Sequence, residues 1–166
     1  IDDEAALRRL IATTLTAQGF DVKQAADGEA GIALCLASPP SLVLSDINMP
    51  GLSGFGVLSR LRAEPVTAAI PVILMTGAGD GADLRRGMEL GADDFLLKPF
   101  GLRDVVQAVQ SRLARQQAFE ARLEKRLADV QTGFGRTLGH ELRTPLNAVL
   151  GYSSLLLEEG GVFSPA

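Results

Sequence analysis

Short apolar runs alternate with amphipathic stretches along the first hundred residues. Continuous apolar runs of strand length lie at Ser41–Ser45 and Ile70–Met75, with shorter candidates at Phe20–Ala25 and Asp93–Leu97. Between them, helical spacing of apolar residues predicts helices at Ala5–Ala17, Gly28–Ala37, Phe55–Leu61 and Ala82–Leu90. Strands that alternate with helices predict a parallel sheet with helices on both faces. The chain opens at Ile1-Asp2-Asp3, where a strand is ending, so we expect the first strand to be truncated.

A different pattern follows Pro99. A stripe with alternating spacings of four and three residues runs through Leu102, Val106, Val109, Leu113, Gln116, Glu120, Leu123, Leu127, Val130 and Phe134. No Pro or Gly lies between Leu102 and Thr132, so one long, coiled-coil-like helix is predicted. Its turns up to about Arg112 would cover the sheet. Beyond that point the stripe needs a partner, most simply a second copy in a homodimer.

Composition narrows the class of protein. The 166 residues are 46% hydrophobic with a formal net charge of −4, which excludes general disorder. The single cysteine, Cys35, excludes a disulfide scaffold and indicates a reducing, cytoplasmic setting. It lies in an apolar helical run, and we expect a core position without chemistry. No apolar run is long enough to span a membrane, and the acidic balance argues against nucleic acid as a partner.

Polar residues follow the predicted strands at the edge where ligands bind in doubly wound sheets. They are Asp2 and Asp3, then Asp46, Thr76 and Lys98. Converging carboxylates repel one another unless a cation lies between them, and oxygen ligands suit Mg²⁺. A hydroxyl and an amine beside such a site could bind phosphoryl oxygens, and a carboxylate could attack phosphorus to form an acyl phosphate.

These residues resemble the receiver domains of two-component response regulators. The matching segments are IDDE at 1–4, LVLSDINMPGLSGF at 42–55, VILMTG at 72–77 and LLKPF at 96–100. The resemblance implies a flavodoxin-like α/β fold with five parallel strands in the order 2-1-3-4-5. It covers residues 1–115, followed by a helical linker at 102–131 that is continuous with the last receiver helix.

The same resemblance assigns roles to individual residues. It implies that Asp46 is the phosphoacceptor and that Asp3, Asp46 and the backbone carbonyl of Asn48 bind Mg²⁺. Asp2 would act through a metal-bound water. Thr76 and Lys98 would contact the phosphoryl group, and Phe95 would be the aromatic residue that reorients on activation. Pro50 and Gly51 would shape the loop after the acceptor, and Pro99 would follow a cis peptide bond.

The only histidine, His140, lies in a second motif, HELRTPLN at 140–147. Glu141 could accept a ring proton and Thr144 falls on the same helical face. This stretch resembles the H-box of the dimerisation and phosphotransfer domain of sensor histidine kinases. The resemblance implies that His140 accepts the γ-phosphoryl group of ATP with Glu141 as general base, assisted by Thr144 and Asn147. Residues 132–166 would then be the first helix of that domain, without its ATP-binding region, so the chain should not autophosphorylate.

We therefore interpret the chain as a fragment of a hybrid histidine kinase, in which phosphorylation of Asp46 changes the pairing of the helix that bears His140. Partners would be a second copy and a histidine kinase or phosphotransfer protein. One alternative reverses the flow, with phosphorylated His140 donating to Asp46. Another is a dimerising scaffold whose pocket has no chemistry. A dehalogenase-type phosphatase is a weaker alternative, because it would need an Asp where the chain has Asn48.

Overall fold

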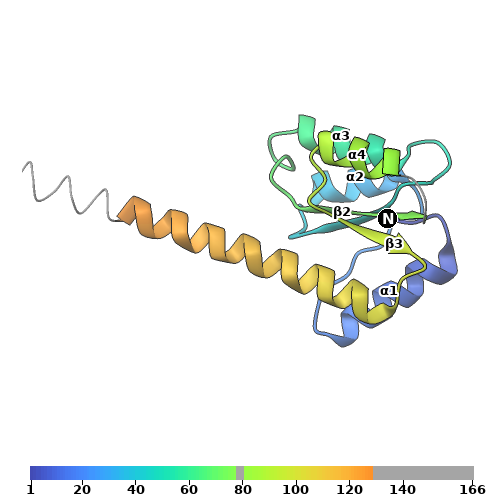
Figure 1. The fold of residues 1–166 in the computed structure, drawn as a ribbon, viewed down its shortest axis with the longest axis horizontal. Coiled ribbons are helices and arrows are strands. Elements are labelled where there is room, and N and C mark those ends of the chain that lie inside the picture. The colour runs from blue at the N-terminus through green and yellow to red at the C-terminus, as the bar shows by residue number, and fades with distance from the viewer. Residues whose placement is uncertain (78–80, 129–166) are drawn as a thin grey trace, which may run out of the picture. The chain divides into compact units, whose positions relative to one another are not determined.

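Three parallel strands form the sheet at the centre of the structure, a computed structural model that describes residues 1–77 and 81–128. The strands are β1 (Val43–Asp46), β2 (Val72–Gly77) and β3 (Asp94–Lys98), in the order β1-β2-β3. Val43 pairs with Val72, and Ile73 pairs with Asp94. The predicted parallel α/β architecture is confirmed (Figure 1).

The helices predicted between residues 5 and 90 are present, and the long helix predicted after Pro99 is described as far as residue 128, whereas the helix predicted within residues 132–166 lies outside the described residues. The described helices are α1 (Ala5–Ala17), α2 (Gly28–Ala37), α3 (Gly54–Ala63), α4 (Gly81–Glu89) and a C-terminal helix over residues 102–128. The bounds of α1 and α2 agree with the prediction. Helix α2 begins after Asp27, because the Asp27 side chain caps it by accepting the Ala30 N–H at 2.8 Å. Helix α3 begins earlier than predicted, at Gly54, where the Ser53 hydroxyl accepts the Gly56 N–H.

Each strand begins and ends one or two residues later than its apolar run. Pairing of β2 starts at Val72 because Pro71 has no N–H to donate. At the other ends, the polar residues Asp46 and Lys98 belong to the strands. Apolar runs mark the part of a strand that is buried, whereas backbone hydrogen bonds decide where it ends.

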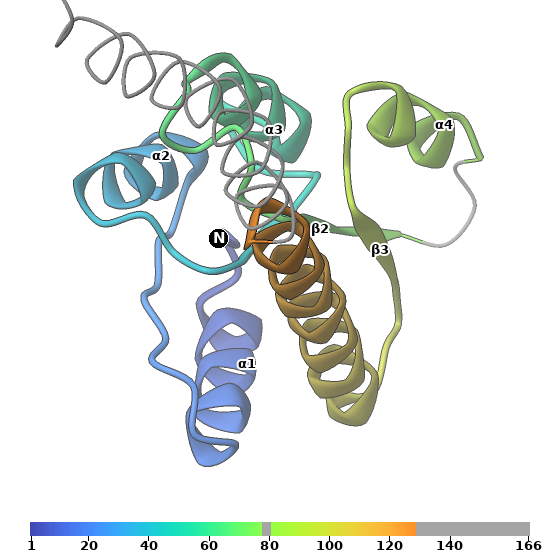
Figure 2. The same cartoon turned by 90° about the vertical axis from the view of Figure 1, so that its left-hand side faces the viewer.

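Alternate residues of β2 divide the core into two layers. Val72 and Leu74 face a cluster that includes Val57, Leu58 and Leu61 of α3. Ile73 and Met75 face the opposite cluster, with Ile11 and Leu15 of α1 and Val105 and Val109 of the C-terminal helix. Helices therefore cover both faces, with α2, α3 and α4 on one face and α1 with the start of the C-terminal helix on the other (Figure 2).

Five strands were expected, and the described residues contain three paired ones. Two further segments occupy the expected neighbouring positions without forming a ladder. Ile1 lies beside β1, where its amino group donates to the Leu44 carbonyl at 2.7 Å and its carbonyl accepts the Asp46 N–H at 2.9 Å. The segment 20–25 lies beyond it, joined by the Asp2 N–H to the Ala25 carbonyl at 3.2 Å. The strand predicted at Phe20–Ala25 is not formed: among the described residues, none of this segment is assigned to a strand, and its Ala25 carbonyl accepts the Asp2 N–H.

The C-terminal helix changes character along its length. Val105 and Val109 are fully or nearly buried, as predicted for the turns that cover the sheet. Phe119, Leu123 and Leu127 are exposed by 67%, 50% and 56%. Two compact units are distinguished, Ile1–Gln117 and a second that begins at Ala118. Among the described residues, no helix is both long and apolar enough to cross a membrane.

Candidate acidic site at the strand ends

The carboxyl ends of the three strands bring together residues that lie far apart in the sequence. Asp46 is the last residue of β1 and Lys98 the last of β3, while Thr76 is next to last in β2. The register pairs Asp46 with Met75 and Gly77 with Lys98, which aligns these ends at one edge of the sheet. Their side chains are therefore held by strand pairing, as the sequence predicts.

Gly54 fixes how closely α3 follows the acceptor strand. Its N–H donates to the Ile47 carbonyl at 3.0 Å, and a Cβ atom there would lie 2.3 Å from the Asp46 carbonyl oxygen. Only glycine allows this approach, because the obstructing atoms belong to the backbone. The turn between them contains Gly51 at φ +75°, a conformation that side chains disfavour. Asn48, in the same turn, is exposed.

Asp2 and Asp3 lie at the same edge of the sheet because the preceding residue, Ile1, is hydrogen-bonded to Leu44 and Asp46 of β1. The Asp2 side chain accepts the Glu4 N–H through Oδ1 at 2.8 Å. Arg8 of α1 donates to the backbone carbonyl of Asp2 at 2.6 Å and to that of Asp3 at 3.4 Å. Arg8 was not predicted from the sequence. Its position in the chain does not show that the first turn of α1 places its guanidinium against the backbone carbonyls of Asp2 and Asp3.

Lys98 is the cation of the site. Its Nζ lies 3.0 Å from Asp46 Oδ1 and 3.5 Å from Asp2 Oδ2, and the two aspartate side chains are almost completely buried. Burial of the ammonium opposes its charge, but the hydrogen bond and charge of Asp46, together with Asp2, outweigh burial and raise the pKa of Lys98 above 10.5. Lys98 thus partly neutralises two buried carboxylates.

Three carboxylates could hold a metal ion here. Oxygen atoms of Asp2, Asp3 and Asp46 all lie within 4.8 Å of one another, and Asp3 is exposed to solvent. Ligand oxygens around an octahedral Mg²⁺ ion lie at most about 4 Å apart, since each is roughly 2.1 Å from the ion. A small inward movement of flexible carboxylates would meet this geometry, so the donor set fits a hard divalent cation.

The remaining predicted residues surround this cluster. Thr76 is buried beside it at the end of β2. Phe95 is partly buried, and its ring lies against Gly87 of α4, where an added Cβ would meet the ring at 2.5 Å. The predicted cis peptide bond between Lys98 and Pro99 is present. Cys35 is buried as predicted, and burial raises the pKa of its thiol.

His140, Glu141, Thr144 and Asn147 lie outside the described residues. Sequence reasoning also missed an ion-pair cluster at the opposite edge of the sheet, formed by Asp93 with Arg62 and Arg112. Its members are 31 and 19 residues apart from Asp93, and they share no motif.

Family comparisons agree with this geometry. The model of the response regulator receiver domain matches residues 1–110, and the model of the His Kinase A phospho-acceptor domain matches residues 130–165. The "Probable transcriptional regulator ycf27" of Cyanophora paradoxa is 42% identical over 115 residues, covering 69% of this chain and 47% of that protein. The "DNA-binding dual master transcriptional regulator RpaA" of Synechocystis is 40% identical, covering 69% and 48%. The chain thus spans about half the length of these curated relatives.

Solved structures show the same fold. The receiver domain of NtrX from Brucella abortus has a TM-score of 0.64 at 28% identity, covering 68% of this chain and 94% of that one. The signal receiver domain of a signal transduction histidine kinase from Syntrophus aciditrophicus has a TM-score of 0.64 at 28% identity, covering 69% and 86%. The chain belongs to the response regulator receiver domain family of two-component systems, and its receiver domain is followed by a segment that matches the His Kinase A phospho-acceptor domain.

Proposed function

We propose that the receiver domain accepts a phosphoryl group on Asp46. The observation that supports this most directly is the placement of the buried Asp46 carboxylate between the Lys98 ammonium, at 3.0 Å, and two further carboxylates. Aspartates that served only the fold would be expected to have enough cations to neutralise them. Among the described residues, Lys98 contacts the Asp2 and Asp46 carboxylates, whereas Arg8 bonds to the backbone carbonyls of Asp2 and Asp3. The three acidic groups therefore leave room for a metal ion and an incoming phosphoryl group.

In the reaction, a carboxylate oxygen of Asp46 attacks phosphorus as the bond to the donor breaks, and the donor leaves with that electron pair. Lys98 releases part of its contact with Asp46 and binds a phosphoryl oxygen, while the Thr76 hydroxyl donates to another. Asp3, Asp46 and the backbone carbonyl of Asn48 would hold Mg²⁺, with Asp2 acting through a bound water. Mg²⁺ would supply positive charge that offsets the repulsion between the carboxylates and the phosphoryl oxygens.

Incubation of the chain with acetyl phosphate and Mg²⁺ tests this proposal. Intact mass spectrometry should show one added phosphoryl group, which is lost in Asp46→Asn and without Mg²⁺. Asp94→Asn is the matched control, because Asp94 lies at the other end of β3 and its carboxylate accepts its neighbour's N–H. Retention of the label in Asp46→Asn would contradict the assignment, and absence of label in the intact chain would favour the scaffold alternative.

We further propose that the receiver acts on a histidine kinase core through the helix that leads to His140. The match of residues 130–165 to the phospho-acceptor domain supports a phosphoryl role for His140, assisted by Glu141, Thr144 and Asn147. ATP would be bound only by a kinase domain outside this chain. An assay that starts from chain phosphorylated on His140 by a histidine kinase decides the direction of flow, since transfer to Asp46 would support the relay.

A homodimer through residues 102–159 completes the proposal. The exposed side chains of Phe119, Leu123 and Leu127 support it, because pairing would remove apolar surface from water at about 25 cal/mol per Å². Light scattering, with and without beryllofluoride and Mg²⁺, should report a dimer in at least one state. Leu123→Glu should give a monomer, whereas Lys125→Glu, outside the stripe, should not. A monomeric intact chain in both states would refute helix pairing.

A further inference from the structure

The three aspartates of the acidic site differ in how their carboxylates are held. Asp46 is the last residue of β1, and its Oδ1 lies 3.0 Å from Lys98 Nζ. Asp2 accepts the Glu4 N–H through Oδ1 at 2.8 Å and faces Lys98 through Oδ2 at 3.5 Å. Asp3 is exposed, and its carboxylate has no hydrogen-bond or ion-pair partner among the described residues. The direction of the Asp3 side chain therefore depends on its backbone.

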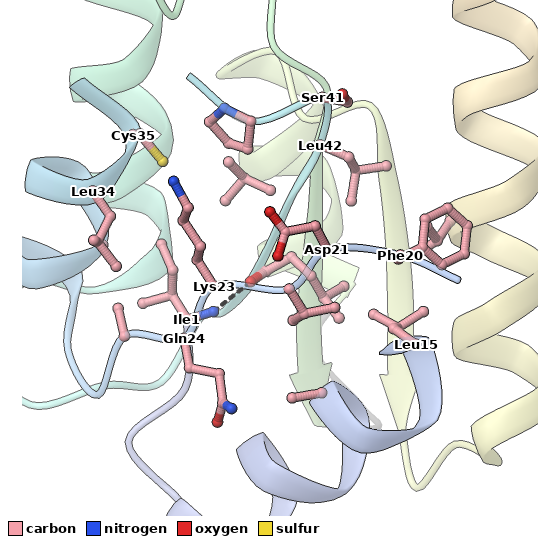
Figure 3. A pocket seen from close by; sticks show the side chains of 18 of the residues that line it. Ile1, Leu15, Phe20, Asp21, Lys23, Gln24, Leu34, Cys35, Ser41 and Leu42 are labelled. Atoms are coloured by element: carbon pink, nitrogen blue, oxygen red, sulfur yellow. Dashed lines mark hydrogen bonds between the residues drawn. The ribbon is translucent and has the colours of Figure 1, made fainter. Parts of the chain in front are cut away.

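The backbone that precedes the acidic pair is fixed to β1. Ile1 lines a pocket of about 570 Å³ beside β1, and its amino group donates to the Leu44 carbonyl at 2.7 Å (Figure 3). The Ile1 carbonyl accepts the Asp46 N–H at 2.9 Å. These bonds hold the peptide unit that joins Ile1 to Asp2. They do not extend to Asp3, which lies in a bend before α1.

Arg8 bonds to the backbone on both sides of Asp3. Its Nη1 donates to the Asp2 carbonyl at 2.6 Å and to the Asp3 carbonyl at 3.4 Å. The Cα atom of Asp3 lies between these two carbonyl groups, and each belongs to a planar peptide unit. One guanidinium therefore restrains both planes that set the direction of the Asp3 side chain. A charged donor makes this restraint stronger than a neutral one would.

The position of Arg8 in α1 does not benefit the helix itself. Arg8 lies in the first turn, where the helix dipole opposes positive charge, and that turn contains no acidic residue. Arg9 carries the same charge, but it is exposed and is turned by about 100° around the helix axis. Arg8 is thus distinguished by its bonds to the acidic pair.

We propose that Arg8 is a positioning residue for the divalent cation, because it holds the backbone of Asp3 so that the Asp3 carboxylate faces those of Asp2 and Asp46. This inference rests on the proposed function, in which Asp3 binds Mg²⁺. Oxygen atoms of the three carboxylates already lie within 4.8 Å of one another, and Mg²⁺ demands nearly ideal octahedral geometry. A restrained Asp3 loses less conformational freedom when the ion binds, so the restraint raises affinity.

The charge of Arg8 and its restraint of the backbone affect metal binding in opposite directions. A positive charge beside the acidic cluster repels a cation, so removal of the charge alone would strengthen Mg²⁺ binding. Loss of the restraint would weaken Mg²⁺ binding. The sign of the change in affinity therefore separates a positioning role from a purely electrostatic one.

Titration of the full chain with Mg²⁺, followed by the backbone amide signals of the site in NMR spectra, gives the dissociation constant. Arg8→Met keeps the apolar stem and a high helix propensity but removes the donor. It should weaken Mg²⁺ binding by about tenfold, the lower end of the range for groups that orient metal ligands. Arg8→Lys keeps a charged donor and should recover most of the loss. Arg9→Met is the matched control and should bind Mg²⁺ at least as tightly as the intact chain.

Unchanged or tighter Mg²⁺ binding in folded Arg8→Met would overturn the proposal, even if that variant were less stable, and so would equal weakening in Arg9→Met. Circular dichroism verifies folding, and Arg8→Gln takes the place of Arg8→Met if the latter does not fold. An intact chain without any response to Mg²⁺ would overturn the metal site of the proposed function together with this inference. Equal Mg²⁺ binding and equal labelling of Asp46 in the intact chain and Arg8→Met would overturn only the role of Arg8.

Discussion

Asp93 should be a main stabilising contact between the sheet and the C-terminal helix. Its Oδ2 accepts from Arg62 Nη2 and from the Val72 N–H, both at 2.8 Å, and its Oδ1 contacts Arg112. The three side chains are 18% to 27% exposed. Arg112 Nε is buried and has no hydrogen-bond partner among the described residues, so Asp93 is the group that compensates this guanidinium.

Asp93→Asn preserves shape and can keep the bond to Val72, but it removes the charge that both arginines face. Hydrogen bonds to charged groups contribute about 1.5–3 kcal/mol each, and partial exposure reduces that value. We expect a loss of about 2–3 kcal/mol in the free energy of unfolding. With a urea m-value of about 1.5 kcal/mol/M, the midpoint should fall by roughly 1.3–2 M.

The exposed pair of Glu29 and Arg60 provides the control. Its atoms are 2.7 Å apart, yet the side chains are 67% and 53% exposed, so Glu29→Gln should cost less than about 0.5 kcal/mol. Urea unfolding followed by circular dichroism measures both variants. An Asp93→Asn loss below about 0.5 kcal/mol, or equal to that of Glu29→Gln, would refute the reasoning that burial and shared partners set the strength of this cluster.

Three further predictions concern the acidic site. Because the pKa of Lys98 is raised, its stabilisation is complete below pH 10.5 and lost as pH rises through the folded-state value. The difference in free energy of unfolding between the intact chain and Lys98→Gln should therefore be constant near neutral pH and become smaller in strong base. A difference that grows with pH in urea titrations would contradict this. Gly54→Ala should cost about 1–3 kcal/mol and abolish labelling by acetyl phosphate, whereas Gly77→Ala, with open space around it, should do neither. Burial lowers the pKa of the Ile1 amino group from 8.0 to about 6, so the unfolded chain binds more protons between these values. In the presence of a chelator, the free energy of unfolding should thus rise by about 2 kcal/mol from pH 6 to 8 relative to the Nα-acetylated chain, and parallel pH curves would contradict that.

Much of the site could be predicted because its residues follow strands. Asp46, Thr76 and Lys98 each stand at the end of an apolar run, and parallel strands place such ends at one edge. The ranges of α1 and α2 were also predictable, since caps and apolar spacing are local properties. Strand ends were displaced by one or two residues, because pairing rather than hydrophobicity defines them.

Other features depended on contacts between segments that share no local pattern. Arg8 over the acidic pair, Phe95 against Gly87, and Asp93 between two arginines follow from how helices pack on the sheet. The pocket of about 570 Å³ beside β1 could not be inferred from composition either, because its walls come from β1, the segment 20–25, α1, α2 and the C-terminal helix.

The sequence by itself determined the family, the order of the elements and the identity of the acidic residues, because these depend on periodicity and on motifs along the chain. The tertiary structure decided which carboxylates Lys98 contacts, how Ile1 bonds to β1 and where the C-terminal helix stops being buried. These are distances between residues remote in sequence, and they are fixed only when the sheet, its helices and its side chains pack together.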